Sequence, residues 1–170
     1  MENILLELYQ NLQKQIGLHR QLMDTVRIER EALILAVLKG VEESTYKKEI
    51  LINSIYQAES ERLKKIGELS VVIKKPAKEL VLTRIIKEIE GLFPEKAKQF
   101  QSVLNTLSVL VQRVTEQNKE NKTLVDNFLK HLNQMKKNVL GEAQPFMDTY
   151  GPEGKKVNAS SGSRLITKEA

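Results

Sequence analysis

A chain of 170 residues that contains no cysteine has room for one domain, and it can be neither a disulfide scaffold nor a thiol enzyme. Aromatic residues make up only 5% of the chain and tryptophan is absent, a composition typical of long helices. The net charge of +5 is spread along the chain and forms no dense basic stripe, so it argues against a nucleic-acid partner.

The first predicted element is one helix over residues 3–39. Seam positions alternate along it in steps of four and three, as in a coiled coil. They are Leu5, Tyr9, Leu12, Ile16, His19, Met23, Val26, Arg30, Leu33 and Val37, and the stripe is widened by Leu8, Leu22 and Ala36. Arg30 in such a seam needs a carboxylate on a neighbouring helix or a route to solvent. Gly40 is the predicted end of this helix.

A turn leads to a second predicted helix over residues 45–74, with Ser44 or Thr45 as its N-cap. Its apolar face consists of Ile50, Ile52, Ile55, Tyr56, Leu63, Ile66 and Leu69. Pro76 lacks an N–H and restricts the residue before it, so the helix ends or bends there. A shorter helix is predicted over residues 77–90 with Leu80, Val81, Ile85, Ile86 and Ile89 facing inward.

The last predicted helix covers residues 94–140, with Pro94 in the first turn, where a missing N–H does no harm. Its seam alternates strictly in steps of four and three, which implies left-handed supercoiling. The seam residues are Phe93, Ala97, Phe100, Leu104, Leu107, Val111, Val114, Asn118, Asn121, Val125, Phe128, Leu132, Met135 and Val139.

After Gly141 the helical period is lost. Residues 142–170 contain Pro145, Pro152 and the polar run 158–163, which is typical of a flexible tail. We therefore predict an all-α fold, an elongated antiparallel helical bundle or coiled coil of three long helices plus a short helix. This helical bundle domain would span residues 1–141.

No set of residues forms a catalytic, cofactor-binding or metal-binding motif. His19 lies on a seam and His131 beside one, and the Glu-x-x-His pair of a helical metal site is missing. The chain has no phosphate-binding glycine loop and no nucleophile elbow. We therefore predict no catalytic residue, no cofactor, no metal and no enzymatic activity.

Targeting signals are also missing from the printed sequence. Glu2 follows Met1 directly, without the basic and apolar regions of a signal peptide. The longest apolar run, Ala32 to Leu38, is far too short for a membrane span. We expect a cytoplasmic protein without stable membrane insertion.

The polar interruption of the last seam leaves two interpretations open. Asn118 and Asn121 either set the register of a coiled coil or mark the point where the helix bends or leaves the bundle to meet a partner. Beyond them lies a second apolar block, Val125, Phe128, Leu132, Met135 and Val139, with Leu124 and Leu129 beside it. If the first helix covers this block, it is core. If it does not, the block is an exposed surface of the kind that holds a partner helix.

Two segments resemble a known family. Residues 114–125, Val-Thr-Glu-Gln-Asn-Lys-Glu-Asn-Lys-Thr-Leu-Val, resemble the Asn-x-x-Asn-x-x-Leu-Leu segment of the FlgN family, the flagellar type III export chaperones for the hook–filament junction proteins. Residues 145–154 resemble that family's Pro-x-x-x-Tyr-Gly-x-Asp-Gly ending, with Glu153 in place of Asp. The resemblance is specific over residues 114–154 and architectural over the first two helices.

This resemblance implies a cytoplasmic chaperone that binds the C-terminal helical regions of hook-associated proteins 1 and 3, prevents premature assembly and delivers them to the export gate. The client-binding residues that it implies are Asn118, Asn121, Leu124, Val125, Phe128, Leu129, Leu132 and Met135. It further implies that Tyr150 and Gly151 dock on the export-gate membrane protein, with components of the export ATPase complex as further partners. The alternative is a structural coiled-coil adaptor or oligomerisation module without an export client.

Overall fold

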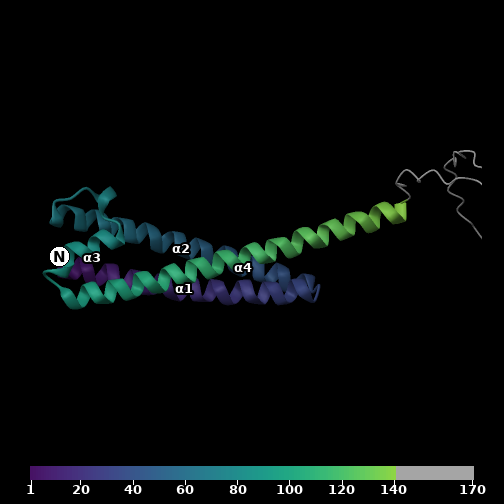
Figure 1. Ribbon diagram of the computed structural model, residues 1–170, viewed down its shortest axis with the longest axis horizontal. Helices are drawn as coiled ribbons and strands as arrows, with labels where there is room; N and C mark the ends of the chain where they lie inside the picture. The colour runs from purple at the N-terminus through teal and green to yellow at the C-terminus, as the bar shows by residue number, and fades with distance from the viewer. Residues whose placement is uncertain (141–170) are drawn as a thin grey trace, which may run out of the picture. The chain divides into compact units, whose positions relative to one another are not determined.

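A computed structural model of the chain describes residues 1–140, and the predicted tail at 142–170 lies outside the described residues (Figure 1). The elements are α1 (Glu2–Ile34), α2 (Leu38–Ile73), the 3-10 turn η1 (Ala77–Glu79), α3 (Leu82–Glu90) and α4 (Pro94–Leu140). Residues 1–140 contain no strand, and the predicted all-α helical bundle is confirmed. One compact unit comprises Met1–Leu124, and a second unit begins at Val125, inside α4.

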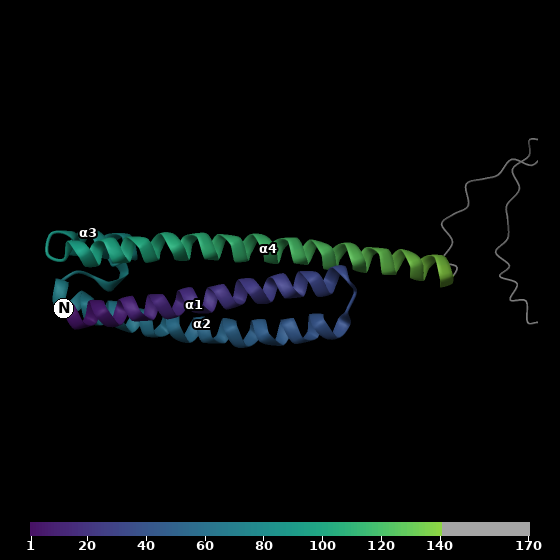
Figure 2. The same cartoon turned by 90° about the horizontal axis from the view of Figure 1, so that it is seen from below.

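Within the first unit, α1 and α2 form an antiparallel hairpin, and α4 runs in the same direction as α1 (Figures 1 and 2). Residues of α1 and α4 that contact each other follow the same order along both helices. Lys96 Nζ lies 2.7 Å from Glu2 Oε1, and the ring of Phe100 packs edge-to-face on Tyr9 with 5.9 Å between centroids. The parallel direction is possible because α2 and α3 carry the chain back to the end at which α1 began.

The turn between α1 and α2 lies earlier than the sequence predicted. The predicted helices 3–39 and 45–74 are in fact separated between Ile34 and Leu38. Ala36 makes the turn with a φ of 52°, a conformation that glycine adopts at least cost. Because an alanine occupies this position, the glycine at 40 indicated a turn several residues too late.

Gly40, the predicted stop, lies inside α2 and serves the packing of the hairpin. A Cβ at this position would lie 3.0 Å from the Cβ of Ala32 on α1. Ser44 is not an N-cap either, because its Oγ donates to the carbonyl oxygen of Gly40 at 2.6 Å and the residue is buried. Small residues here let the two helices approach closely just after the turn.

Only part of the predicted inward face of α2 is buried. Ile66 and Leu69 belong to the core, as predicted. Four other residues of that face are between 40% and 69% exposed: Ile50, Ile52, Tyr56 and Leu63. The reason is that α2 buries a single stripe, on which Ser44 and Ala58 also lie, and this stripe is narrower than the apolar pattern.

The end of α2 agrees with the prediction, whereas the next helix differs. Lys74 follows α2 with a φ of 57°, and Pro76 comes two residues later. The predicted helix 77–90 is divided into η1 and α3 around Val81, whose backbone is extended. Because neighbouring side chains of an extended chain point in opposite directions, Leu80 is buried while Val81, predicted to face inward, is 58% exposed.

The bounds of α4 match the prediction, but two of its buried residues differ by one position from the predicted seam. Val103 and Leu110 are buried, each one residue ahead of the predicted Leu104 and Val111, and Val111 is 46% exposed. Both alternatives are apolar, so the periodicity of the sequence could not choose between them. The core of the first unit comprises Leu5, Leu8, Leu12, Ile16, Ile66, Leu69, Leu80, Ile85, Ile86, Ile89, Ala97, Phe100, Val103 and Leu110.

Substitution of Gly17 by alanine should stabilise the first unit. Gly17 lies inside α1, and a Cβ there would meet no atom within 4 Å. The expected gain in the free energy of unfolding is about 1 kcal/mol, from helix propensity alone, measured by urea unfolding. Gly40→Ala is the matched comparison and should gain less, because its Cβ would press on Ala32. Equal gains for the two variants would show that the hairpin widens at no cost.

Candidate functional site

A buried polar layer, Glu29, Lys48 and Asn121, joins three helices of the first unit. Asn121 on α4 is 3% exposed, and its Nδ2 donates to the carbonyl oxygen of Val26 and to Glu29 Oε2 on α1, both at 2.9 Å. Lys48 on α2 donates to the other oxygen of Glu29 at 2.6 Å. Because a buried charge without its partner is costly, this layer fixes the register of α4 on the hairpin.

Two carbonyl oxygens beside the polar layer lack a hydrogen bond. Among residues 1–140, the buried side-chain oxygens of Gln117 and Asn121 find no donor. An unsatisfied buried acceptor costs about 1–3 kcal/mol.

Arg30 has the partner that the sequence required. It forms an ion pair with Glu120 on α4, next to Asn121. Both side chains are substantially exposed, so the pair adds little to stability. The prediction of a carboxylate on a neighbouring helix is confirmed.

Beyond Leu124, the apolar side chains of α4 form one exposed face, which we call the distal stripe. Its members are Val125, Phe128, Leu129, Leu132, Met135 and Val139. Their exposed fractions range from 36% at Val125 to 81% at Val139. Steps of three and four residues place them on one side of the helix. Contiguous exposed apolar faces are common on surfaces that contact other polypeptides.

Of the two possibilities for this block, core or exposed surface, the structure shows the exposed one. All six residues of the distal stripe are at least 36% exposed. An exposed amphipathic helix face can hold a helix of another chain.

One comparison with known proteins identifies a family for this chain. The family model described as FlgN protein matches residues 1–158. The chain belongs to the FlgN family. FlgN proteins are flagellar export chaperones, a family of chaperones and not of enzymes, and the match covers the first two helices as well. No curated protein and no solved structure matches this chain.

The structure places the FlgN client-binding residues predicted from the sequence in three environments. Asn118 is exposed, Leu124 is half-buried, and Asn121 is buried in the polar layer. The other five are exposed in the distal stripe: Val125, Phe128, Leu129, Leu132 and Met135. Tyr150 and Gly151 lie outside the described residues, so their role stays a prediction, as does client binding by the other eight.

Sequence reasoning missed the partners of Asn121 in this FlgN-family chain. Glu29 lies beside the first seam and Lys48 beside the apolar face of α2, and neither position stands out in the pattern. The available signal was the polar residue at a seam position, which demands a hydrogen-bonding partner on another helix.

Within residues 1–140, no group of three or more His, Asp or Glu side chains is arranged to hold a metal ion. No helix in the same range is long and apolar enough to cross a membrane.

Proposed function

We propose that this FlgN-family protein is a cytoplasmic chaperone that binds the C-terminal helical regions of hook-associated proteins 1 and 3 through the distal stripe. The observation that supports this most directly is the exposure of six large apolar side chains on one face of α4. A client that polymerises through amphipathic helices must have them covered before export. The distal stripe supplies such a cover, which prevents premature assembly until the client is delivered to the export gate.

The expected affinity is moderate. A helix–helix interface that buries about 1,000 Å² of apolar surface gains roughly 25 kcal/mol before costs, at about 25 cal/mol per Å². Ordering of side chains and loss of free motion offset most of this gain. A moderate net affinity suits a complex that must release its client at the export gate.

The three residues that precede the stripe would contribute in different ways. Leu124 is half-buried and continues the apolar face towards the first unit. Asn118 is exposed and can contact a client directly. Asn121 is engaged with α1, so we propose that it supports client binding by holding α4 in place.

The proposal is tested by sedimentation of the purified chain with C-terminal peptides of each hook-associated protein. We expect a complex of defined stoichiometry with either peptide. Co-purification of the full-length clients from a coexpressing strain should agree. A chain that associates with itself and ignores both peptides would instead be a coiled-coil adaptor.

We further propose that Tyr150 and Gly151 dock on the export-gate membrane protein, near components of the export ATPase complex. Tyr150→Ala should then retain client binding and reduce secretion of both hook-associated proteins. Motility on soft agar and the amount of secreted client measure this. The control is Thr149→Ala, which shortens the neighbouring side chain and should leave export intact. Normal swimming of the Tyr150→Ala strain would exclude the docking role.

A further inference from the structure

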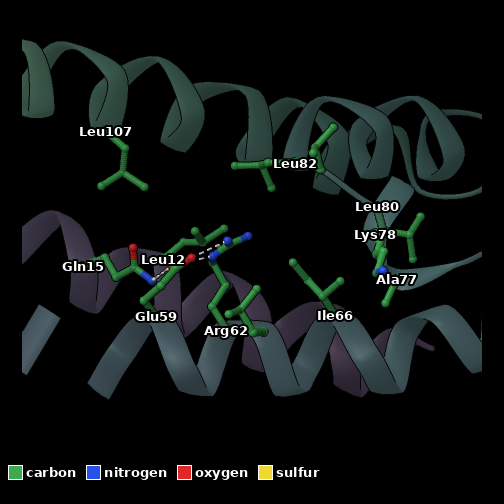
Figure 3. A pocket seen from close by; sticks show the side chains of 12 residues that line it. Leu12, Gln15, Glu59, Arg62, Ile66, Ala77, Lys78, Leu80, Leu82 and Leu107 are labelled. Carbon is green, nitrogen blue, oxygen red and sulfur yellow. Dashed lines mark hydrogen bonds and ion pairs between the residues drawn. The ribbon is translucent and has the colours of Figure 1, made fainter. Parts of the chain in front are cut away.

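The first unit contains an open hollow of about 480 Å³ between α1, α2, η1, α3 and α4 (Figure 3). The core residues Leu12, Ile66 and Leu80 form its floor, and the half-buried Leu82 and Leu107 form part of its walls. At the rim, Leu63 is 56% and Val81 is 58% exposed. None of these residues belongs to the distal stripe, so the hollow is a separate surface of the chain.

The charged side chain of Arg62 reaches into this hollow. Arg62 extends from α2 between the apolar side chains, and its Nε and Nη2 donate to Glu59 at 2.7 and 2.6 Å (Figure 3). Gln15 donates to Glu59 at 3.4 Å. The hydrogen bonds from Arg62 lower the pKa of Glu59.

The guanidinium of Arg62 has hydrogen-bonding capacity left over. It carries five N–H donors, and two of them are used by Glu59. Among residues 1–140, the structure gives the other three no acceptor. The side chain is only 20% exposed, so an acceptor that reaches it would bind in a partly desolvated environment, where charge-assisted bonds are strong.

Cationic side chains continue from the rim of the hollow onto a neighbouring depression. Lys78 on η1 lines both, and Arg84 and Lys87 on α3 line the depression. Glu79 lines the depression too, and Arg84 pairs with Glu88 at 3.2 Å, so Lys78 and Lys87 supply most of the positive charge. Because Val81 is shared by the two depressions, the apolar surface and the cationic surface are continuous.

We propose that this hollow is a second docking site, which takes a short acidic amphipathic segment of a partner protein. The apolar side chains of that segment would occupy the hollow, one carboxylate would accept hydrogen bonds from Arg62, and further acidic residues would face Lys78 and its neighbours. Such an occupant matches the charge of the rim and the apolar character of the walls. This site is independent of client binding by the distal stripe.

Selection of 12-residue peptides displayed on phage against the full chain tests the site. Enriched peptides should combine Leu, Ile or Phe with Asp or Glu. Their affinity should fall at least about tenfold for the variant Lys78→Glu with Val81→Glu. Both positions are exposed, so circular dichroism should remain unchanged.

The matched control is Lys64→Glu with Val72→Glu, which changes the same residue types at exposed positions of α2 that do not line the hollow. Its affinity for the enriched peptides should equal that of the unchanged chain. Enrichment of neutral or basic peptides, no enrichment at all, or equal losses in both variants would overturn the proposal. Loss of binding in Phe128→Asp alone would assign the peptides to the distal stripe and overturn it as well.

Discussion

Replacement of Phe128 by aspartate should abolish binding of the hook-associated protein peptides. Phe128 lies near the middle of the distal stripe and is 56% exposed without a client. The variant loses about 2 kcal/mol of apolar burial and must also desolvate a carboxylate. Together these effects should raise the Kd at least about 100-fold, as measured by titration calorimetry with each peptide.

The control for Phe128→Asp is Val109→Asp, the same kind of change at a 48% exposed valine of α4 outside the distal stripe. Both variants should keep the helical circular dichroism of the unchanged chain, because neither side chain belongs to the core. Client affinity should be retained in Val109→Asp. An unaltered affinity in Phe128→Asp would remove the distal stripe as the client-binding surface.

Replacement of Glu29 by alanine should have the largest effect on stability. The side chains of Glu29 and Lys48 are only 9% and 18% exposed, so the variant leaves a largely buried ammonium without its partner. Asn121 loses one of its two acceptors at the same time. We expect the free energy of unfolding to fall by about 3 kcal/mol, as measured by urea unfolding.

Glu31→Ala provides the comparison for this prediction, because Glu31 lies on the same helix and is exposed. Its free energy of unfolding should change by less than about 0.5 kcal/mol. Exchange of the α4 amides around Asn121 should accelerate in Glu29→Ala and not in Glu31→Ala. If the two variants are equally stable, the polar layer does not hold α4 in register.

The end of the polar layer and the start of the distal stripe follow each other along α4. Asn121 is bound to α1, Leu124 is half-buried, and Val125 is the first residue of the exposed stripe. One helix thus carries its packing residues and its exposed apolar face in succession. Substitutions at Asn121 should therefore act on client binding only through the placement of α4, whereas substitutions at Phe128 act on it directly.

Local patterns determined much of this protein. Steps of three and four residues located the helices, and Pro94 and Pro76 marked a start and an end, because helix periodicity and proline sterics depend only on nearby residues. The apolar block after Asn121 and the resemblance of residues 114–154 to FlgN proteins could also be read directly from the chain.

Only the tertiary structure decided which of these apolar residues are used. It placed the turn at Ala36, chose Val103 and Leu110 over their apolar neighbours, and brought Glu29 and Lys48 to Asn121. These outcomes depend on which helices face each other and at what register. Both the pairing and the register are determined by contacts between residues that are far apart in the chain. The same reason explains the hollow around Arg62, whose lining residues come from five separate elements.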